Sequence, residues 1–331
     1  MKMLNRPGMT LGGVAVTTAA LLMLGGVAAN AADLAPDPLA AVAKAAPQSL
    51  VNAAKVPSSS SGSQAMSATI AGTDVVVPVD PGHGIQVKSE RGQTSVGLPF
   101  AAQAHDATAK GDGVVSYDNN NGSSTVPIVQ KDGAVQINTV IRNSDAPKRY
   151  GYPLTVSAGQ SIHLAPDGSA YVAAATGVPS LYIAAPWAKD ANGKAVSTHF
   201  EVNGTTLTQV VDFTASTAFP VVADPTIMTT GQADYNCVLT NGSSYFMAPG
   251  SPLTNCKGSY LQKYYNGVMV KSVGLVYNGK YTVKVTGSGW CILALAGGMT
   301  LAFTPVTATI TWFVATVATA GGIYASCKDF V

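Results

Sequence analysis

The longest charge-free stretch of this sequence most constrains what the chain can fold into. No charged residue occurs between Lys284 and Lys328, and residues 289–327 are rich in Ala, Thr, Val, Ile and aromatic side chains. An apolar segment of this length has to bury its surface either in a protein core or in a lipid bilayer. The sequence alone leaves both solutions open.

Helix signals divide this stretch in two. Pro305, preceded by a threonine that suits an N-cap, fits the first position of a helix that continues to Tyr324. A shorter helix is expected before it, from Trp290 to about Leu301. At about 1.5 Å per residue only the second helix covers a hydrocarbon core of about 30 Å. Residues 289–331 are therefore predicted to form an apolar α-helical hairpin.

The amino terminus predicts export. Lys2 and Arg6 precede an apolar run, and the run ends at the small-residue site Ala29-Asn30-Ala31. Residues 1–31 are interpreted as a signal peptide that is cleaved after Ala31. The alternative is an uncleaved anchor. A secreted or extracellular location is expected, with association to the cell envelope as a variant of it.

Export decides how the four cysteines are interpreted. Outside the cytoplasm, Cys237, Cys256, Cys291 and Cys327 favour two disulfides over a zinc site, because no Cys-x-x-Cys spacing is present. Of the three connectivities we favour the sequential one. An antiparallel hairpin places the start of its first helix beside the end of its second, where Cys291 and Cys327 fall.

Charge divides the chain into two parts. Residues 66–225 hold nine basic and thirteen acidic side chains, a net of −4, whereas residues 226–331 hold six lysines and two aspartates, a net of +4. A basic, apolar tail behind an acidic domain indicates either intramolecular attraction or an anionic membrane surface as partner. The lysines are too few to follow a phosphate backbone, which argues against nucleic acid. The sequence indicates no protein partner.

Residues 32–66 are rich in Ala, Pro and Ser and are interpreted as a linker or propeptide. The sequence also allows a short amphipathic helix around Pro38–Ala54, interrupted by Pro47. Residues 67–225 then show short β-rich runs separated by turn pairs, which predicts a β-sandwich-like domain or an open barrel. The strongest hairpin signals are Asp132-Gly133, Asp167-Gly168, Asn192-Gly193 and Asn203-Gly204. The expected strands are Asp74–Val79, Ile85–Lys88, Gly113–Tyr117, Thr125–Val129, Ala134–Ile141, Leu154–Val156, Ser161–Leu164, Tyr171–Ala174, Leu181–Ala184, Val196–Val202 and Thr206–Phe213.

Residues 226–288 predict a small cationic β-meander. Its expected strands, 259–265, 268–277 and 280–285, are joined by two Asn-Gly turns, and the loop closed by Cys237 and Cys256 would staple its entry. The fold class is therefore mainly β, with an apolar helical hairpin at the end. The candidates for contact with a membrane are Lys263, Lys271, Lys280, Lys284, Trp290, Trp312 and Phe313. Tyr264, Tyr265, Tyr277 and Tyr281 fit either an interfacial belt or the cover of a thin sheet.

Parts of the sequence resemble two known groups of proteins. The runs VPIVQKDGAVQINTVI, PWAKDANGKAVSTHFEVNG and FPVVADP resemble the β-rich domain of uncharacterised secreted proteins of actinobacteria. In those proteins the part after the junction differs from one to another, which implies export and a module boundary at 223–225. The run 263–268, KYYNGV, is similar to the YGNGV box of pediocin-like bacteriocins, but it lacks the glycine before the asparagine and the paired cysteines within the sheet. That similarity implies a cationic sheet followed by an apolar hairpin.

No motif predicts catalysis, a cofactor or a metal. The chain lacks a Gly-x-Ser-x-Gly elbow, a His-Glu-x-x-His pair and a phosphate-binding glycine loop. Scattered candidates remain in His83, His105, His163 and His199. Trp187 fits either a sugar-stacking position or the closure of a core.

We therefore expect a secreted, non-enzymatic protein whose cationic sheet and apolar hairpin act on or insert into membranes, in the manner of a bacteriocin or toxin. The alternative is a structural or binding protein of the cell envelope whose ligand is unknown. In that case the hairpin is core or anchor. A hydrolase is the third hypothesis, and it requires a histidine near both a carboxylate and a hydroxyl.

Overall fold

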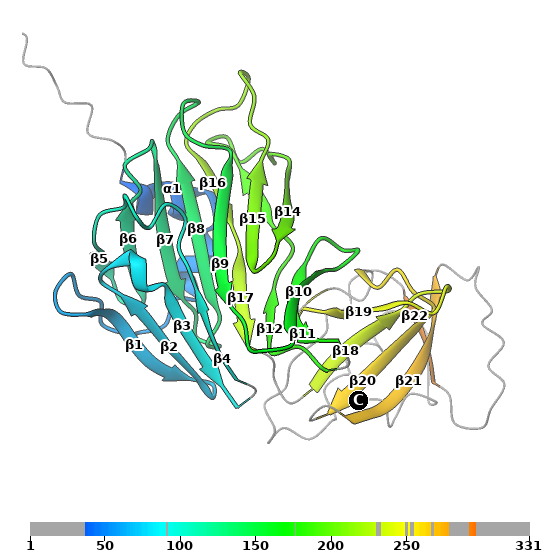
Figure 1. The fold of residues 1–331 in the computed structure, drawn as a ribbon. Helices are drawn as coiled ribbons and strands as arrows, with labels where there is room; N and C mark the ends of the chain where they lie inside the picture. Colours follow the sequence, from blue (N-terminus) through cyan, green and yellow to red (C-terminus); the bar gives the residue numbers. More distant parts are fainter. Residues whose placement is uncertain are drawn as a thin grey trace, which may run out of the picture. The chain divides into compact units, whose positions relative to one another are not determined.

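The computed structural model describes residues 37–90, 92–175, 177–229, 233–248, 251, 255–265, 268–277 and 291–295 (Figure 1). Most of these residues lie in strands, and all but one of the strand pairings given for them are antiparallel. The prediction of a mainly β protein with several antiparallel sheets is confirmed.

The first sheet has seven strands among the described residues, in the order β1-β2-β3-β4-β9-β15-β14. Neighbours that follow each other in the chain are joined by tight turns, as at Asn203-Gly204 between β14 and β15. The strands are β1 (Gln64–Ile70), β2 (Thr73–Pro78), β3 (Ile85–Ser89), β4 (Gly92–Val96), β9 (Arg149–Thr155), β14 (Thr198–Asn203) and β15 (Thr206–Val211). A short 3-10 turn, η1 (Pro81–His83), precedes β3.

The second sheet has ten strands in the described part of the chain. Eight follow the order β10-β11-β12-β17-β8-β7-β6-β5, and β16 joins β13 to β8. Its strands are β5 (Thr108–Gly111), β6 (Val114–Asp118), β7 (Ser123–Val129), β8 (Val135–Ile141), β10 (Gln160–Leu164), β11 (Ala170–Ala174), β12 (Leu181–Ile183), β13 (Trp187–Lys189), β16 (Val221–Asp224) and β17 (Thr226–Thr229).

The two sheets share one hydrophobic core. Val77 and Ile85 from the first sheet belong to the same buried cluster as Ile137 and Ile183 from the second. Tyr152 is also buried there, and its hydroxyl lies 3.1 Å from the Thr139 hydroxyl across the core. Burial of these apolar side chains is the main stabilising term for the domain. We call residues 37–229 the two-sheet domain.

Two helices, α1 (Pro38–Ala45) and α2 (Pro47–Val51), cover the outer face of the second sheet. Asp37 caps α1 by accepting a hydrogen bond from the Leu39 amide, and Val42 is fully buried against β-strand residues such as Ile128. The helices explain why β7 and β8 are buried along their whole length. The expectation of a linker over residues 32–66 is therefore wrong from Asp37 onward, because the alanines and prolines there pack as helices.

A third sheet follows, with the order β19-β18-β20-β21-β22 among the described residues. Its strands are β18 (Ala233–Val238), β19 (Ser244–Met247), β20 (Tyr260–Tyr265), β21 (Val268–Tyr277) and β22 (Cys291–Leu295). We call it the C-terminal sheet. Strands β20 and β21 were predicted, whereas β18 and β19 were not.

The module boundary lies later than the sequence suggested. Strand β17 comes after Pro225, yet Thr226 pairs with Gln136 of β8 and Ile227 pairs with Ile183 of β12. The second sheet therefore ends at Thr229 and not at Pro225. The short β17 was missed because its apolar side chains are too few to show alternation.

Candidate functional site in the C-terminal sheet

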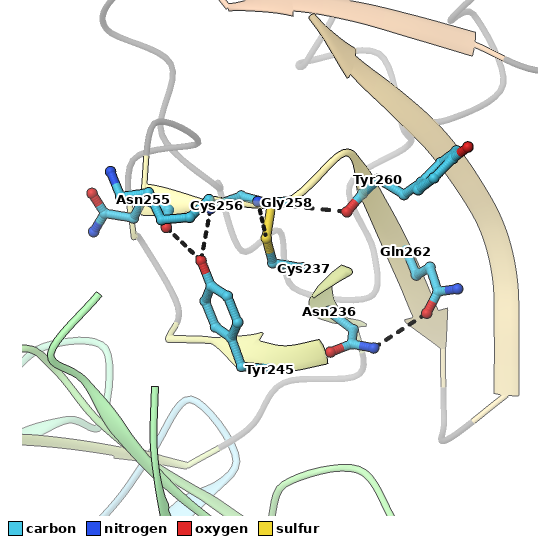
Figure 2. Close-up of a disulfide and its surroundings, with 9 residues drawn as sticks. Asn236, Cys237, Tyr245, Asn255, Cys256, Gly258, Tyr260 and Gln262 are labelled. Atoms are coloured by element: carbon cyan, nitrogen blue, oxygen red, sulfur yellow. Dashed lines mark hydrogen bonds between the residues drawn. A yellow bond between two sulfur atoms is a disulfide. The ribbon is translucent and has the colours of Figure 1, made fainter. Parts of the chain in front are cut away.

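A disulfide holds the C-terminal sheet together (Figure 2). Cys237 of β18 is bonded to Cys256, which lies between β19 and β20, and their Cα atoms are 5.4 Å apart. Both cysteines are fully buried. The first predicted pair is confirmed, and a disulfide fits an oxidising compartment outside the cytoplasm. The second pair lies outside what the structure describes, because residue 327 is beyond it.

A tyrosine hydroxyl reinforces the same loop. The Tyr245 hydroxyl donates to the carbonyl of Asn255 at 2.6 Å and accepts from the amide of Lys257 at 2.9 Å (Figure 2). Gly258 follows, and its amide donates to Cys237 Sγ at 3.2 Å. A Cβ atom at Gly258 would lie 2.0 Å from the carbonyl oxygen of Val238, so the backbone packs too closely for any side chain.

The pairing of β20 with β21 places two of the candidate lysines opposite each other. Lys263 of β20 is the cross-strand partner of Lys271 of β21, and a register shift follows directly after Lys263. Alternation along β20 assigns Lys263 to the same face as Leu261, which is fully buried, and Lys263 itself is half-buried. The described part of the predicted cationic sheet thus has two lysine positions opposite each other in neighbouring strands. Lys280, Lys284, Trp290, Trp312 and Phe313 lie outside the described residues.

The described part of the charge-free stretch is a strand. Residues 291–295 form β22, which pairs in parallel with β21 through partners such as Val273 and Cys291. The expectation of a helix starting at Trp290 is wrong for these five residues, because the exposed edge of β21 offers backbone partners that the sequence pattern does not reveal. The remainder of the predicted hairpin lies outside the described residues, as does the expected strand 280–285.

Aromatic side chains line the other face of the C-terminal sheet. Tyr264 lies 5.4 Å from Phe246, and Phe246 lies 6.0 Å from Tyr171 of β11, measured between ring centroids. Tyr171 in turn stacks on His163 at 5.0 Å. Tyr264 therefore covers a thin sheet, the second of the two readings given to it. The buried hydroxyl of Tyr182 also donates to Asp234 at 3.4 Å.

The histidines lie on separate elements. His83 ends η1 beside Asp80, His105 is in a loop, and His163 contacts the Ser161 hydroxyl at 3.1 Å. His199 lies 3.5 Å from Glu201, while the nearby hydroxyl of Ser197 donates to Asp212 and not to the imidazole. The hydrolase hypothesis requires a histidine in contact with both a hydroxyl and a carboxylate. Among the described residues, no histidine makes both contacts directly.

Trp187 packs as core rather than as a projecting side chain. It is half-buried on β13, belongs to the cluster beneath α1, and has Lys189 Nζ 5.5 Å from its ring centroid. The contacts of Trp187 therefore agree with the prediction that this side chain closes a core.

Sequence reasoning missed one buried titratable residue. Asp224 is 1% exposed, and its Oδ2 accepts hydrogen bonds from Gln136 Nε2 at 2.7 Å and Thr226 Oγ1 at 2.8 Å. Burial raises the pKa of Asp224 to about 6, and these two donors offset part of that rise. The only signal in the sequence was an aspartate within the otherwise apolar run FPVVADP.

Three further findings concern metal groups, membrane-spanning helices and similarity to known proteins. Within the described ranges, no group of three His, Cys, Asp or Glu side chains is arranged to hold a metal ion. No helix in that same part of the chain has the length and apolar character needed to cross a membrane. Comparison with protein-family models, with curated proteins and with solved structures finds no match.

Proposed function

We propose that the chain is an exported, non-enzymatic protein whose C-terminal part acts on anionic membranes, with the two-sheet domain as its carrier. The observation that carries this proposal is the parallel pairing of β22 with β21. This pairing attaches the start of the charge-free stretch to the strand that carries Lys271. Positive charge and the longest apolar segment of the sequence therefore begin side by side.

The lysine register also supports the proposal. The backbone register places Lys263 of β20 opposite Lys271 of β21, so two lysine positions adjoin in the sheet. Met269, two residues before Lys271, is 50% exposed, which is unusual for so large an apolar side chain. Lysines beside exposed apolar groups suit the boundary between lipid headgroups and acyl chains.

Vesicle binding tests this function. The full mature chain, with its disulfides intact, is mixed with vesicles of phosphatidylglycerol or of phosphatidylcholine, and sedimentation and dye leakage are measured. We expect binding to the anionic vesicles, weaker at high salt, and leakage from them. The double variant Lys263→Gln, Lys271→Gln should bind about 30-fold more weakly, since each lysine near an anionic surface contributes about 1 kcal/mol.

Lys88→Gln is the matched control, because Lys88 is an exposed lysine on β3 of the two-sheet domain. Its binding should equal that of the unchanged protein. Equal affinity for both kinds of vesicle, or an unaffected double variant, contradicts the membrane function. A protein that stays with the cell envelope without binding lipid supports the second candidate, a structural or binding protein of the envelope.

A further inference from the structure

Asp224 is followed by Pro225 at the break between β16 and β17, where both strands pair with β8. The hydrogen bonds of normal geometry to its carboxyl all reach one of the two oxygens. Oδ2 accepts the two hydrogen bonds from Gln136 and Thr226, whereas Oδ1 is buried and accepts no hydrogen bond of normal geometry from the described residues. A buried polar atom without a partner is costly and calls for an explanation.

The hydrogen bonds that fix the other carboxyl oxygen point to an explanation. Thr226 lies on the far side of Pro225, so the bond from its hydroxyl ties the carboxyl of Asp224 to the chain beyond the proline. The carbonyl of Pro225, which belongs to the following peptide bond, accepts from the amide of Ile137 at 2.9 Å, and Ala223 on the other side pairs with Thr139 of β8. The carboxyl and the backbone on both sides of the Asp224–Pro225 bond are thus held in place, which is the condition under which an intramolecular reaction becomes fast.

The surroundings keep this carboxyl protonated in mild acid. Burial raises its pKa to about 6, and the donors on Thr226, Gln136 and Trp187 lower it in part. The titratable group that faces it from β9 is the Tyr152 phenol, whose own pKa is raised by burial, so it stays neutral. Asp224 forms no ion pair with the described residues.

We propose that Asp224 cleaves its own peptide bond to Pro225. A carboxyl oxygen attacks the main-chain carbonyl carbon of Asp224 and closes a five-membered cyclic anhydride. The bond from that carbon to the Pro225 nitrogen breaks, and the nitrogen takes the carboxyl proton to become a secondary amine. Water then opens the anhydride, so the products end in a free aspartic acid and begin with proline. A carboxyl acting as an internal nucleophile is established enzyme chemistry, and the step needs no co-reactant except water.

The chain supplies its own controls, because two more Asp–Pro bonds occur at Asp37–Pro38 and Asp80–Pro81. Asp37 is half exposed, and its Oδ1 caps α1 and pairs with Lys110 at 3.1 Å. Asp80 is also exposed, and its Oδ1 accepts from the Gly82 amide at 2.8 Å. The folded protein should therefore distinguish Asp224–Pro225 from bonds of identical covalent chemistry.

Cleavage at this point would not separate the fragments at once. Strand β17 remains paired with β8 and β12, so the C-terminal fragment stays attached to the two-sheet domain until β17 is displaced. The cut protein should elute as one species under native conditions and as two after denaturation. The inference is independent of the membrane proposal, since cleavage is measured without lipid.

The test is mass spectrometry of the full chain, incubated natively at pH 5 and at pH 8 and sampled over days. We expect a new C-terminus at Asp224 and a new N-terminus at Pro225, formed at least about tenfold faster than cuts at the other two bonds. The rate should rise as the pH falls through about 6, and hydroxylamine should capture the anhydride as a hydroxamate on Asp224. In urea, all three bonds should hydrolyse at similar, slow rates.

Two variants complete the test. Asp224→Asn should fold, as judged by circular dichroism, and remain uncut at pH 5. Thr226→Val removes a positioning hydrogen bond, so cleavage should slow and its pH midpoint should rise. No cut at Asp224–Pro225 in the native chain, equal cutting of all three bonds there, or continued cutting of a folded Asp224→Asn protein would each overturn the proposal.

Discussion

Tyr245 and Asn255 are joined by a hydrogen bond of 2.6 Å from phenol to backbone carbonyl, inside the loop that the Cys237–Cys256 disulfide closes. The loop is therefore closed twice, once by sulfur and once by a buried tyrosine. A thin sheet has little core of its own, so such cross-links contribute a large share of its stability.

Replacing this hydroxyl tests its contribution. Tyr245→Phe removes the donor to Asn255 and the acceptor for the Lys257 amide, and it leaves both backbone groups without that partner. We expect a loss of about 1–3 kcal/mol in urea unfolding and faster reduction of the disulfide by thiols. Tyr264→Phe is the control, because its hydroxyl makes a longer bond of 3.3 Å to Gln262. If the two variants lose the same stability, the hydroxyl of Tyr245 has no special role.

Gly258 should tolerate no side chain. In Gly258→Ala the new methyl would meet the Val238 carbonyl oxygen at 2.0 Å and Cys237 Sγ at 3.0 Å. We expect destabilisation by about 3 kcal/mol and a lower yield of the correctly paired disulfide. At Gly151 in β9 the nearest atom to a new Cβ is Thr206 Cγ2 at 3.5 Å, so Gly151→Ala should be close to neutral. A stable Gly258→Ala protein with an intact disulfide contradicts the prediction.

The buried carboxyl predicts how stability depends on pH. The pKa of Asp224 in the folded chain is about 6, above its ordinary value of 3.8, so the folded state binds the proton more tightly. The contribution of the protonated Asp224 to the free energy of unfolding is fully present below pH 4 and is lost as the pH rises through 6. The total loss is roughly 3 kcal/mol. Chemical denaturation of fresh protein at pH 5 and pH 8 should reveal the loss, and Asp224→Asn should remove this part of the difference. An unchanged pH dependence in that variant contradicts the assignment.

The helical cover should behave as core. Val42 of α1 is fully buried, and Val51 of α2 is 61% exposed. Val42→Ala should lower the free energy of unfolding by roughly 2 kcal/mol, while Val51→Ala should change it by less than about 0.5 kcal/mol. Both substitutions gain the same helix propensity, so the difference isolates packing against the sheet. If Val42→Ala and Val51→Ala have equal effects on thermal unfolding, residues 37–51 act as a linker and not as part of the core.

Much of the two-sheet domain was predictable where local chemistry decides the fold. Three of the four Asp-Gly and Asn-Gly pairs lie at a turn between paired strands, as at Asp132-Gly133 between β7 and β8, and Asn192-Gly193 lies inside the isolated bridge between Lys189 and Ala195. Strand β9 was recognised only at its end, because Gly151 and Pro153 are poor strand formers and tertiary pairing with β15 overrides them. The sequence allowed a short helix around Pro38–Ala54 but did not decide for it, because alanine and proline are also common in linkers. The structure has two helices there, and the second begins at Pro47.

The candidate site was predictable in part. The Cys237–Cys256 pair was predicted from the expectation of export together with the sequential order of the four cysteines, and neither requires knowledge of the fold. The facing of Lys263 and Lys271 depends on a register shift in β21, and the burial of Asp224 depends on β8, β13 and β17 meeting around it. The contacts around Asp224 join residues far apart in the chain, and the shift that sets the lysine register has no signal in the local sequence pattern.

The cover formed by α1 also has a consequence for synthesis. A chain emerges from its amino end first, so α1 is made early, yet part of the surface it rests on belongs to Val222 of β16, near the end of the domain. The helix has no completed docking surface until almost the whole domain has been made. Until then a chaperone must shield the apolar side of α1, or that side remains in solvent. The exposure ends when β16 has been made and α1 can pack against it.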